Sequence, residues 1–92
     1  MSDLSTQTLY AEAILGKDVE EWLKSDTGRY MVAGFEEDEK EALDALSKVH
    51  PWRWKRIIQL QERIRVARKF KSLAAEMIVT GKQALQQLES SE

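Results

Sequence analysis

Apolar residues along this chain recur every three or four positions, which is the period of a helix that buries one face. The longest run consists of Ile57, Leu60, Ile64, Ala67, Ala74, Ile78, Leu85 and Leu88. It predicts a helix over 51–88, with a kink or break near Gly81, which follows two β-branched residues. Pro51 suits the first turn of this helix, where no backbone donor is needed. We expect residues 89–92 to form a frayed tail.

Two shorter helical patterns precede the long one. Residues 27–49 carry an apolar seam of Met31, Phe35, Ala42, Leu46 and Val49. Residues 6–25 predict N-terminal helices, in which we expect Gly16 to end or bend the first helix. Asp18 and Glu21 have the spacing of a capping box, which would start a short helix after that break. A corner between the two segments is indicated by Ser25, Asp26 and Gly28.

The composition agrees with an all-α protein of one domain, residues 1–92. One proline and four glycines leave little material for strands and tight turns. A short turn at His50 and Pro51 makes the second and third helices antiparallel neighbours. The predicted architecture is therefore an antiparallel helical hairpin with a long C-terminal helix, and with short N-terminal helices packed against it in a small helical bundle.

The sequence indicates a cytoplasmic protein. It contains no cysteine, which excludes disulfides and fits a reducing compartment. The N-terminus lacks the basic and apolar regions of a signal peptide, and no window approaches the roughly 18 apolar residues of a membrane span.

Opposite charges occupy different parts of the chain. Residues 1–50 hold 12 acidic and 5 basic side chains, whereas residues 51–71 hold 8 basic side chains and a single acidic one. In the antiparallel hairpin the acidic run at 36–41 lies beside residues 60–65. We therefore expect the carboxylates of this run to form ion pairs with Arg63, Arg65 and Arg68. Exposed pairs of this kind contribute about 0 to 1 kcal/mol each, so they select the register more than they stabilise the fold.

A nucleic-acid interface is the alternative interpretation of the basic stretch 53–71. Its candidate contacts are Arg53, Lys55, Arg56 and Arg63, with Trp52 and Trp54 available to stack on bases. Two observations oppose it. The positive charges are distributed around the helix, and the whole chain has a net charge of −2.

Two further groups of residues are candidates for a protein interface. We expect Trp52 and Trp54 to close the end of the hairpin core over Val49 and Leu46; if exposed, they become candidate anchors for a partner. The long helix also outruns the second helix, which leaves Met77, Ile78, Leu85 and Leu88 without cover from that arm. We expect the N-terminal segment to cover part of this stripe and an oligomer contact to cover the rest.

No pattern for catalysis, a metal or a cofactor is present. The chain has no glycine-rich phosphate loop, serine elbow or cysteine nucleophile, and its single histidine cannot build an ordinary zinc site. We therefore expect a non-enzymatic protein without a small-molecule substrate.

Two stretches also resemble known proteins: WLKSDTGRYMVAGFEEDEKEALDAL and IIQLQERIRVARKFKSLAAEMIVTGKQAL. They are similar to short helical proteins, often uncharacterised, that are encoded in tailed-phage and prophage gene clusters. The resemblance extends from Ala11 to Leu88, with Ser25 and Gly28-Arg29-Tyr30 as its distinctive cluster. It implies a small structural or accessory component of phage assembly, in the bacterial cytoplasm or in the virion. An inhibitor of a host protein is a further alternative.

Overall fold

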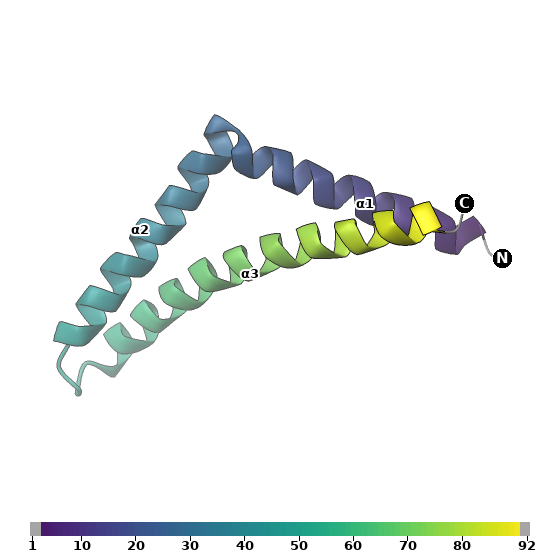
Figure 1. Cartoon of the computed structure of the whole chain (residues 1–92). Coiled ribbons are helices and arrows are strands. Elements are labelled where there is room, and N and C mark those ends of the chain that lie inside the picture. Colours follow the sequence, from purple (N-terminus) through teal and green to yellow (C-terminus); the bar gives the residue numbers. More distant parts are fainter. Residues whose placement is uncertain (1–2, 91–92) are drawn as a thin grey trace.

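Three helices form the protein in the computed structural model, which describes residues 3–90. They are α1 (Asp3–Lys24), α2 (Asp26–Lys48) and α3 (Trp54–Ser90). Figure 1 shows α1 beside the C-terminal half of α3 and α2 beside its N-terminal half, so that α1 begins at the end of the molecule where α3 ends. This arrangement confirms the predicted all-α bundle with a long C-terminal helix.

The molecule is long and flat. Its Cα atoms span 60 × 29 × 15 Å, and their radius of gyration is 18.6 Å. A compact domain of this length has a radius of gyration of about 12 Å. A single layer of helices explains the difference, because each helix contacts its neighbours only along its edges.

The turn between α2 and α3 is longer than the sequence indicated. The backbone N–H of Arg53 donates to the carbonyl of His50 at 3.0 Å, and α3 begins only at Trp54. Pro51 therefore lies in the turn and not in the first helical turn. At its other end α3 continues to Ser90, whereas residues 91 and 92 of the expected tail lie outside the described part of the chain.

Ser25 forms the corner between α1 and α2. Its hydroxyl accepts a hydrogen bond from the backbone N–H of Gly28 at 3.0 Å and donates one to the carbonyl of Trp22 at 2.5 Å. This is the N-cap arrangement that satisfies a free donor at the start of a helix. Gly28 is buried there, and a Cβ at this position would collide with the carbonyl of Trp22. The predicted corner is therefore confirmed.

The helix breaks expected at Gly16 and near Gly81 were wrong. Helix α1 runs without interruption through Gly16, and α3 runs without interruption through Gly81. Both glycines are buried because they face each other across the contact between α1 and α3. A Cβ on Gly16 would lie 2.7 Å from the carbonyl oxygen of Met77 and 2.8 Å from the Cα of Gly81. The two glycines thus let the backbones of the helices approach closely.

Apolar packing between α2 and α3 centres on a small core near the turn. Ala42, Leu60 and Ile64 are buried there, and Ala45 and Leu46 pack against them. Farther along the hairpin an aromatic cluster connects all three helices. Phe70 of α3 stacks on Phe35 of α2 at 4.5 Å between ring centroids, and it forms a T-shaped pair with Trp22 of α1 at 6.2 Å.

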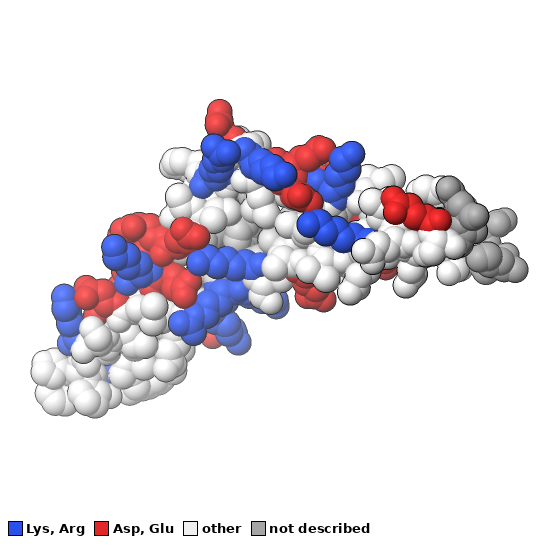
Figure 2. Space-filling model, viewed as in Figure 1, with Lys and Arg blue, Asp and Glu red and all other residues white. Residues whose placement is uncertain are grey.

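Ion pairs join the two arms of the hairpin, as the charge pattern predicted. A guanidinium nitrogen of Arg63 lies 2.7 Å from Asp38 and 3.6 Å from Glu41. Arg68 Nε lies 3.0 Å from Glu39, and Lys71 Nζ lies within 3.7 Å of both Glu36 and Glu39. Figure 2 shows acidic and basic side chains next to each other over α2 and the adjacent part of α3. Arg65 differs from the prediction, because it pairs with Glu62 of its own helix at 2.7 Å.

Glu39 is the most enclosed carboxylate of these pairs, with 17% of its side chain exposed. The hydrogen bond from Arg68 lowers the pKa of Glu39, and the nearby positive charges of Lys71 and Arg68 lower it further. On the other arm, the hydrogen bond to Asp38 raises the pKa of Arg63. Both shifts favour the charged form, that of the Glu39 carboxylate and that of the Arg63 guanidinium.

Candidate functional site

An apolar groove lies between α1 and the last third of α3. Its volume is about 520 Å³, and the buried Gly16 and Gly81 are among the residues that line it. The apolar part of its lining consists of Tyr10, Ala13 and Ile14 from α1 and Ile78, Leu85 and Leu88 from α3. Lys17 and Glu20 line it on α1, and Lys82 and Glu89 line it on α3. Each wall therefore combines apolar side chains with one charge of each sign.

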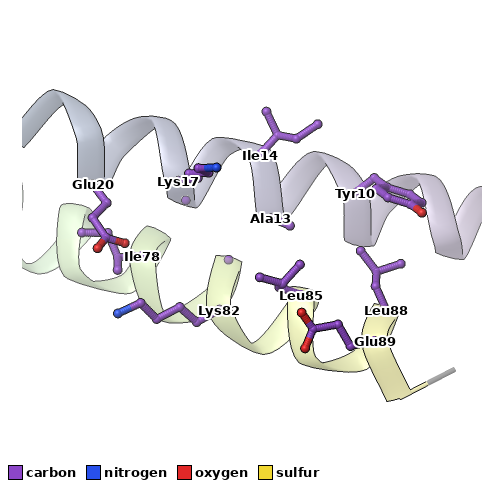
Figure 3. A pocket seen from close by; sticks show the side chains of 12 residues that line it. Tyr10, Ala13, Ile14, Lys17, Glu20, Ile78, Lys82, Leu85, Leu88 and Glu89 are labelled. Carbon is purple, nitrogen blue, oxygen red and sulfur yellow. The ribbon is translucent and has the colours of Figure 1, made fainter. Parts of the chain in front are cut away.

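The close-up in Figure 3 shows how these side chains are arranged. From α3, Leu85 points toward Ala13 and Leu88 points toward Tyr10, whereas Ile14 points outward at the edge of the groove. Leu85 keeps 49% of its surface exposed, and Ile14 and Tyr10 are also exposed. The groove therefore presents an apolar surface to its surroundings even though α1 and α3 already pack together.

Three residues of the predicted interface stripe line this groove: Ile78, Leu85 and Leu88. Met77 does not, because it is half-buried and its carbonyl oxygen lies against Gly16. As expected, α1 folds back over this part of α3 and covers it only in part. The sequence prediction missed Tyr10 and Ile14, because it did not show which face of α1 meets α3.

The contact between α1 and α3 could have been located from small residues that lie three positions apart on each helix. Gly16 on α1 meets Gly81 on α3. Ala13 and Ala84 lie three positions from these glycines, and all four residues are buried or half-buried. Small residues at this spacing allow two helices to pack closely. The same glycines were interpreted as helix breakers in the sequence, because their partner on the other helix is more than sixty residues away.

The two tryptophans of the hairpin tip are exposed, so the prediction that they close the core was wrong. Trp52 is 74% exposed and Trp54 is 60% exposed. The physical reason is the longer turn, which places Trp52 before the helix, where it stacks on His50 at 4.5 Å. Lys55 Nζ lies 5.6 Å from the centre of the Trp54 ring. Both indoles thus remain available to a partner.

A second group of candidate residues surrounds these indoles. The side chains of Arg53, Lys55 and Arg56 line a shallow depression of about 350 Å³ together with both tryptophans and Gln59. Arg63 lies apart from this group, because it is held between Asp38 and Glu41 on the hairpin. The structure therefore brings together three of the four basic residues considered as nucleic-acid contacts.

The accessible surface of the chain is large for its mass. It measures 7220 Å² for 10.6 kDa. A compact monomer of this mass exposes about 5,500 Å². The excess of roughly 1,700 Å² matches the area that one subunit contributes to two standard interfaces of about 800 Å² each. Within the described residues, no helix is apolar enough over its length to cross a membrane, and no group of three metal-ligating side chains occurs.

The sequence matches no protein-family model, no curated protein and no solved structure.

Proposed function

We propose that this protein is a non-enzymatic assembly module whose copies associate through the apolar groove between α1 and α3. The observation that carries the proposal is the exposed apolar lining of that groove, with Ile14 and Leu85 at its edges. Burying such side chains gains about 25 cal/mol per Å² of apolar surface, which drives most protein association.

A second copy of the chain is a suitable occupant of this groove, because the lining is apolar and carries charges of both signs. Two grooves brought face to face would place two pairs of helices in contact, which converts the flat layer into a four-helix arrangement. Because each wall carries one lysine and one glutamate, a two-fold related wall can offer opposite charges to both. The excess accessible surface supplies the area that this contact requires.

The resemblance to proteins of tailed-phage and prophage gene clusters suggests the setting for such assembly. In that setting the chain would be a small structural or morphogenesis accessory protein, acting in the cytoplasm of a bacterial host or in the virion. Its partners would be other copies of itself within a larger protein assembly.

Solution mass measured by light scattering at increasing concentration tests the groove contact. We expect Leu85→Asp to weaken association by about tenfold or more, because it places a charge in the apolar contact. Gln83→Asp is the matched control, because Gln83 is exposed on the same helix and does not line the groove. Equal masses for Leu85→Asp and wild type would contradict the groove contact, provided that circular dichroism shows the same helix content.

A nucleic-acid role is the second candidate function, and the exposed hairpin tip favours it. Two accessible indoles beside Arg53, Lys55 and Arg56 are suited to stacking on unpaired bases and contacting phosphates. Fluorescence anisotropy with a labelled single-stranded oligonucleotide tests this role at several salt concentrations. Salt-sensitive binding that is lost in Arg53→Ala combined with Arg56→Ala would support it. An absence of binding at low salt would exclude it.

A further inference from the structure

The outer face of α3 carries a stripe that is separate from the groove. Figure 1 shows α1 and α2 on one side of α3, so the opposite side meets no other helix. A set of exposed positions on α3 lies out of phase with the buried Leu60, Ile64 and Ala67. Its successive members are three or four residues apart and alternate between charged and apolar side chains. They are Lys55, Ile58, Glu62, Val66, Lys69, Leu73 and Glu76, and we call them the outer stripe.

Every residue of the outer stripe is exposed. Ile58, Val66 and Leu73 keep 49%, 55% and 51% of their surface accessible, although all three are large and apolar. The spacing keeps them on one face, because residues three and four apart are neighbours on a helix surface. From Lys55 to Glu76 the stripe is about 32 Å long at 1.5 Å per residue. It is therefore a narrow apolar seam with charges between its members.

The order of charges makes this stripe complementary to itself in one orientation. If two copies cross antiparallel with a two-fold axis between Arg65 and Val66, Glu62 faces Lys69 of the second copy, and Lys55 faces its Glu76. The same alignment places Ile58 opposite Leu73. A parallel alignment in register would instead place each charge opposite an identical one, which is unfavourable. Self-complementarity of this kind is what an isologous two-fold interface requires.

The charges of the stripe remain accessible for such contacts. Within residues 3–90, Lys69 and Glu76 form no ion pair, and Glu62 pairs only with Arg65 on the same helix. That i,i+3 pair is exposed and weak, so Glu62 can contact a second cation at little cost. The positive charges that face α2 are different, because Arg63, Arg68 and Lys71 are already paired there.

We infer that a second copy of this chain binds along the outer stripe, with the two α3 helices antiparallel and related by a two-fold axis between Arg65 and Val66. The alternating charges specify the orientation, and Ile58, Val66 and Leu73 supply the buried apolar area. The excess accessible surface of the chain accommodates this contact in addition to the groove contact. The two surfaces share no residue, so each can be disabled without the other.

Charge reversal tests the contact along the outer stripe. All variants are made in a parent protein that carries Leu85→Asp, because this substitution removes the groove contact. Glu62→Lys would place lysine opposite Lys69 twice in each dimer, and Lys69→Glu would place glutamate opposite Glu62 twice. We expect either single variant to weaken self-association by about tenfold or more. The variant that carries both reversals restores attraction, and so does an equimolar mixture of the two single variants.

Sedimentation equilibrium gives the mass of the parent, of the two single variants, of the double reversal and of the mixture. The same proteins without Leu85→Asp provide a second measurement. Dimers of the parent, of the double reversal and of the mixture, with monomers of each single variant, would support the inference. A monomeric parent would overturn it, and so would single variants that dimerise as well as the parent. These two results would leave the groove contact untouched. A failure of the groove contact is seen in a different comparison, as equal masses for wild type and Leu85→Asp.

Discussion

Gly16 and Gly81 face each other across the contact between α1 and α3, where a Cβ on either glycine would lie 2.8 Å from the Cα of the other. The atoms that surround them belong to backbone, so they cannot move aside as a flexible side chain would. This contact fixes the distance between the two helices that form the apolar groove. The groove therefore depends on two residues that contribute no side chain to it.

Replacing one of these glycines with alanine should destabilise the protein, although alanine is the better helix former. The added methyl group of Gly81→Ala would meet the Gly16 Cα at 2.8 Å and the Glu12 carbonyl oxygen at 3.0 Å. Overpacking of this kind costs about 1 to 3 kcal/mol, against a helix-propensity gain of about 1 kcal/mol. We expect a net loss of up to about 2 kcal/mol in the free energy of unfolding, measured by urea denaturation.

Gly34→Ala is the matched control, because a Cβ there meets no atom within 4 Å. That variant should gain up to about 1 kcal/mol, since only helix propensity changes. Stabilisation of similar size by both variants would contradict the close approach of α1 and α3.

The ion pairs of the hairpin predict a loss of stability in acid. Hydrogen bonding from Arg68 lowers the pKa of Glu39 below its ordinary value of 4.5. A carboxylate with a lowered folded-state pKa contributes stability that is complete above the unfolded-state value and is lost as the pH falls through the folded-state value. Glu39→Gln should therefore reduce the dependence of the unfolding free energy on pH below 4.5.

Chemical denaturation between about pH 2 and pH 7 measures this effect. Glu37→Gln is the control, because Glu37 is exposed and forms no ion pair within the described residues. The same change of slope in both variants would show that the contact with Arg68 has no special effect on stability.

The exposed hairpin tip predicts that one large aromatic residue can be removed without a loss of stability. Trp54→Ala should change the free energy of unfolding by no more than about 0.5 kcal/mol, because Trp54 is 60% exposed. Leu60→Ala, six residues away on the same helix, should cost about 2 to 5 kcal/mol, because Leu60 is completely buried. Thermal or urea unfolding distinguishes the two, and a cost of several kcal/mol for Trp54→Ala would place the indole in the core.

The hairpin could be predicted from the sequence because two features indicate it: the apolar period within each helix, and the opposite charges of the two arms. Apolar periodicity located the helices, and the opposite charge blocks indicated which arms meet, as the contact between Arg63 and Asp38 now shows. The contact between α1 and α3 was harder to specify. A glycine has the same helix-breaking tendency wherever it occurs, and only the register of the two helices shows that Gly16 and Gly81 meet.

The candidate interfaces were predictable in part for similar reasons. Leu85 and Leu88 follow a periodic apolar stripe, so the sequence identified them as lacking cover from α2. The exposure of Trp52 depends on where the turn ends, which propensities place only within a few residues. Charge alternation on the outer stripe is visible in the sequence, but its exposure is not, because that depends on which face of α3 meets α2.

Cysteine cross-linking tests the orientation of the proposed α3 pair, and the chain contains no native cysteine. In the antiparallel alignment Ile58 of one copy lies opposite Leu73 of the other. An equimolar mixture of Ile58→Cys and Leu73→Cys should therefore form a disulfide-linked dimer on mild oxidation. Either variant alone should form little, because its cysteines lie far apart in the dimer. Efficient cross-linking of Ile58→Cys with itself would indicate parallel helices.

The central claim is that the open faces of this flat, three-helix molecule are covered by other copies of the chain. Sedimentation equilibrium of the wild-type protein over a wide concentration range tests it most directly. We predict a mass that rises above the 10.6 kDa of the monomer as concentration increases. A mass that stays at 10.6 kDa at every concentration would contradict the claim.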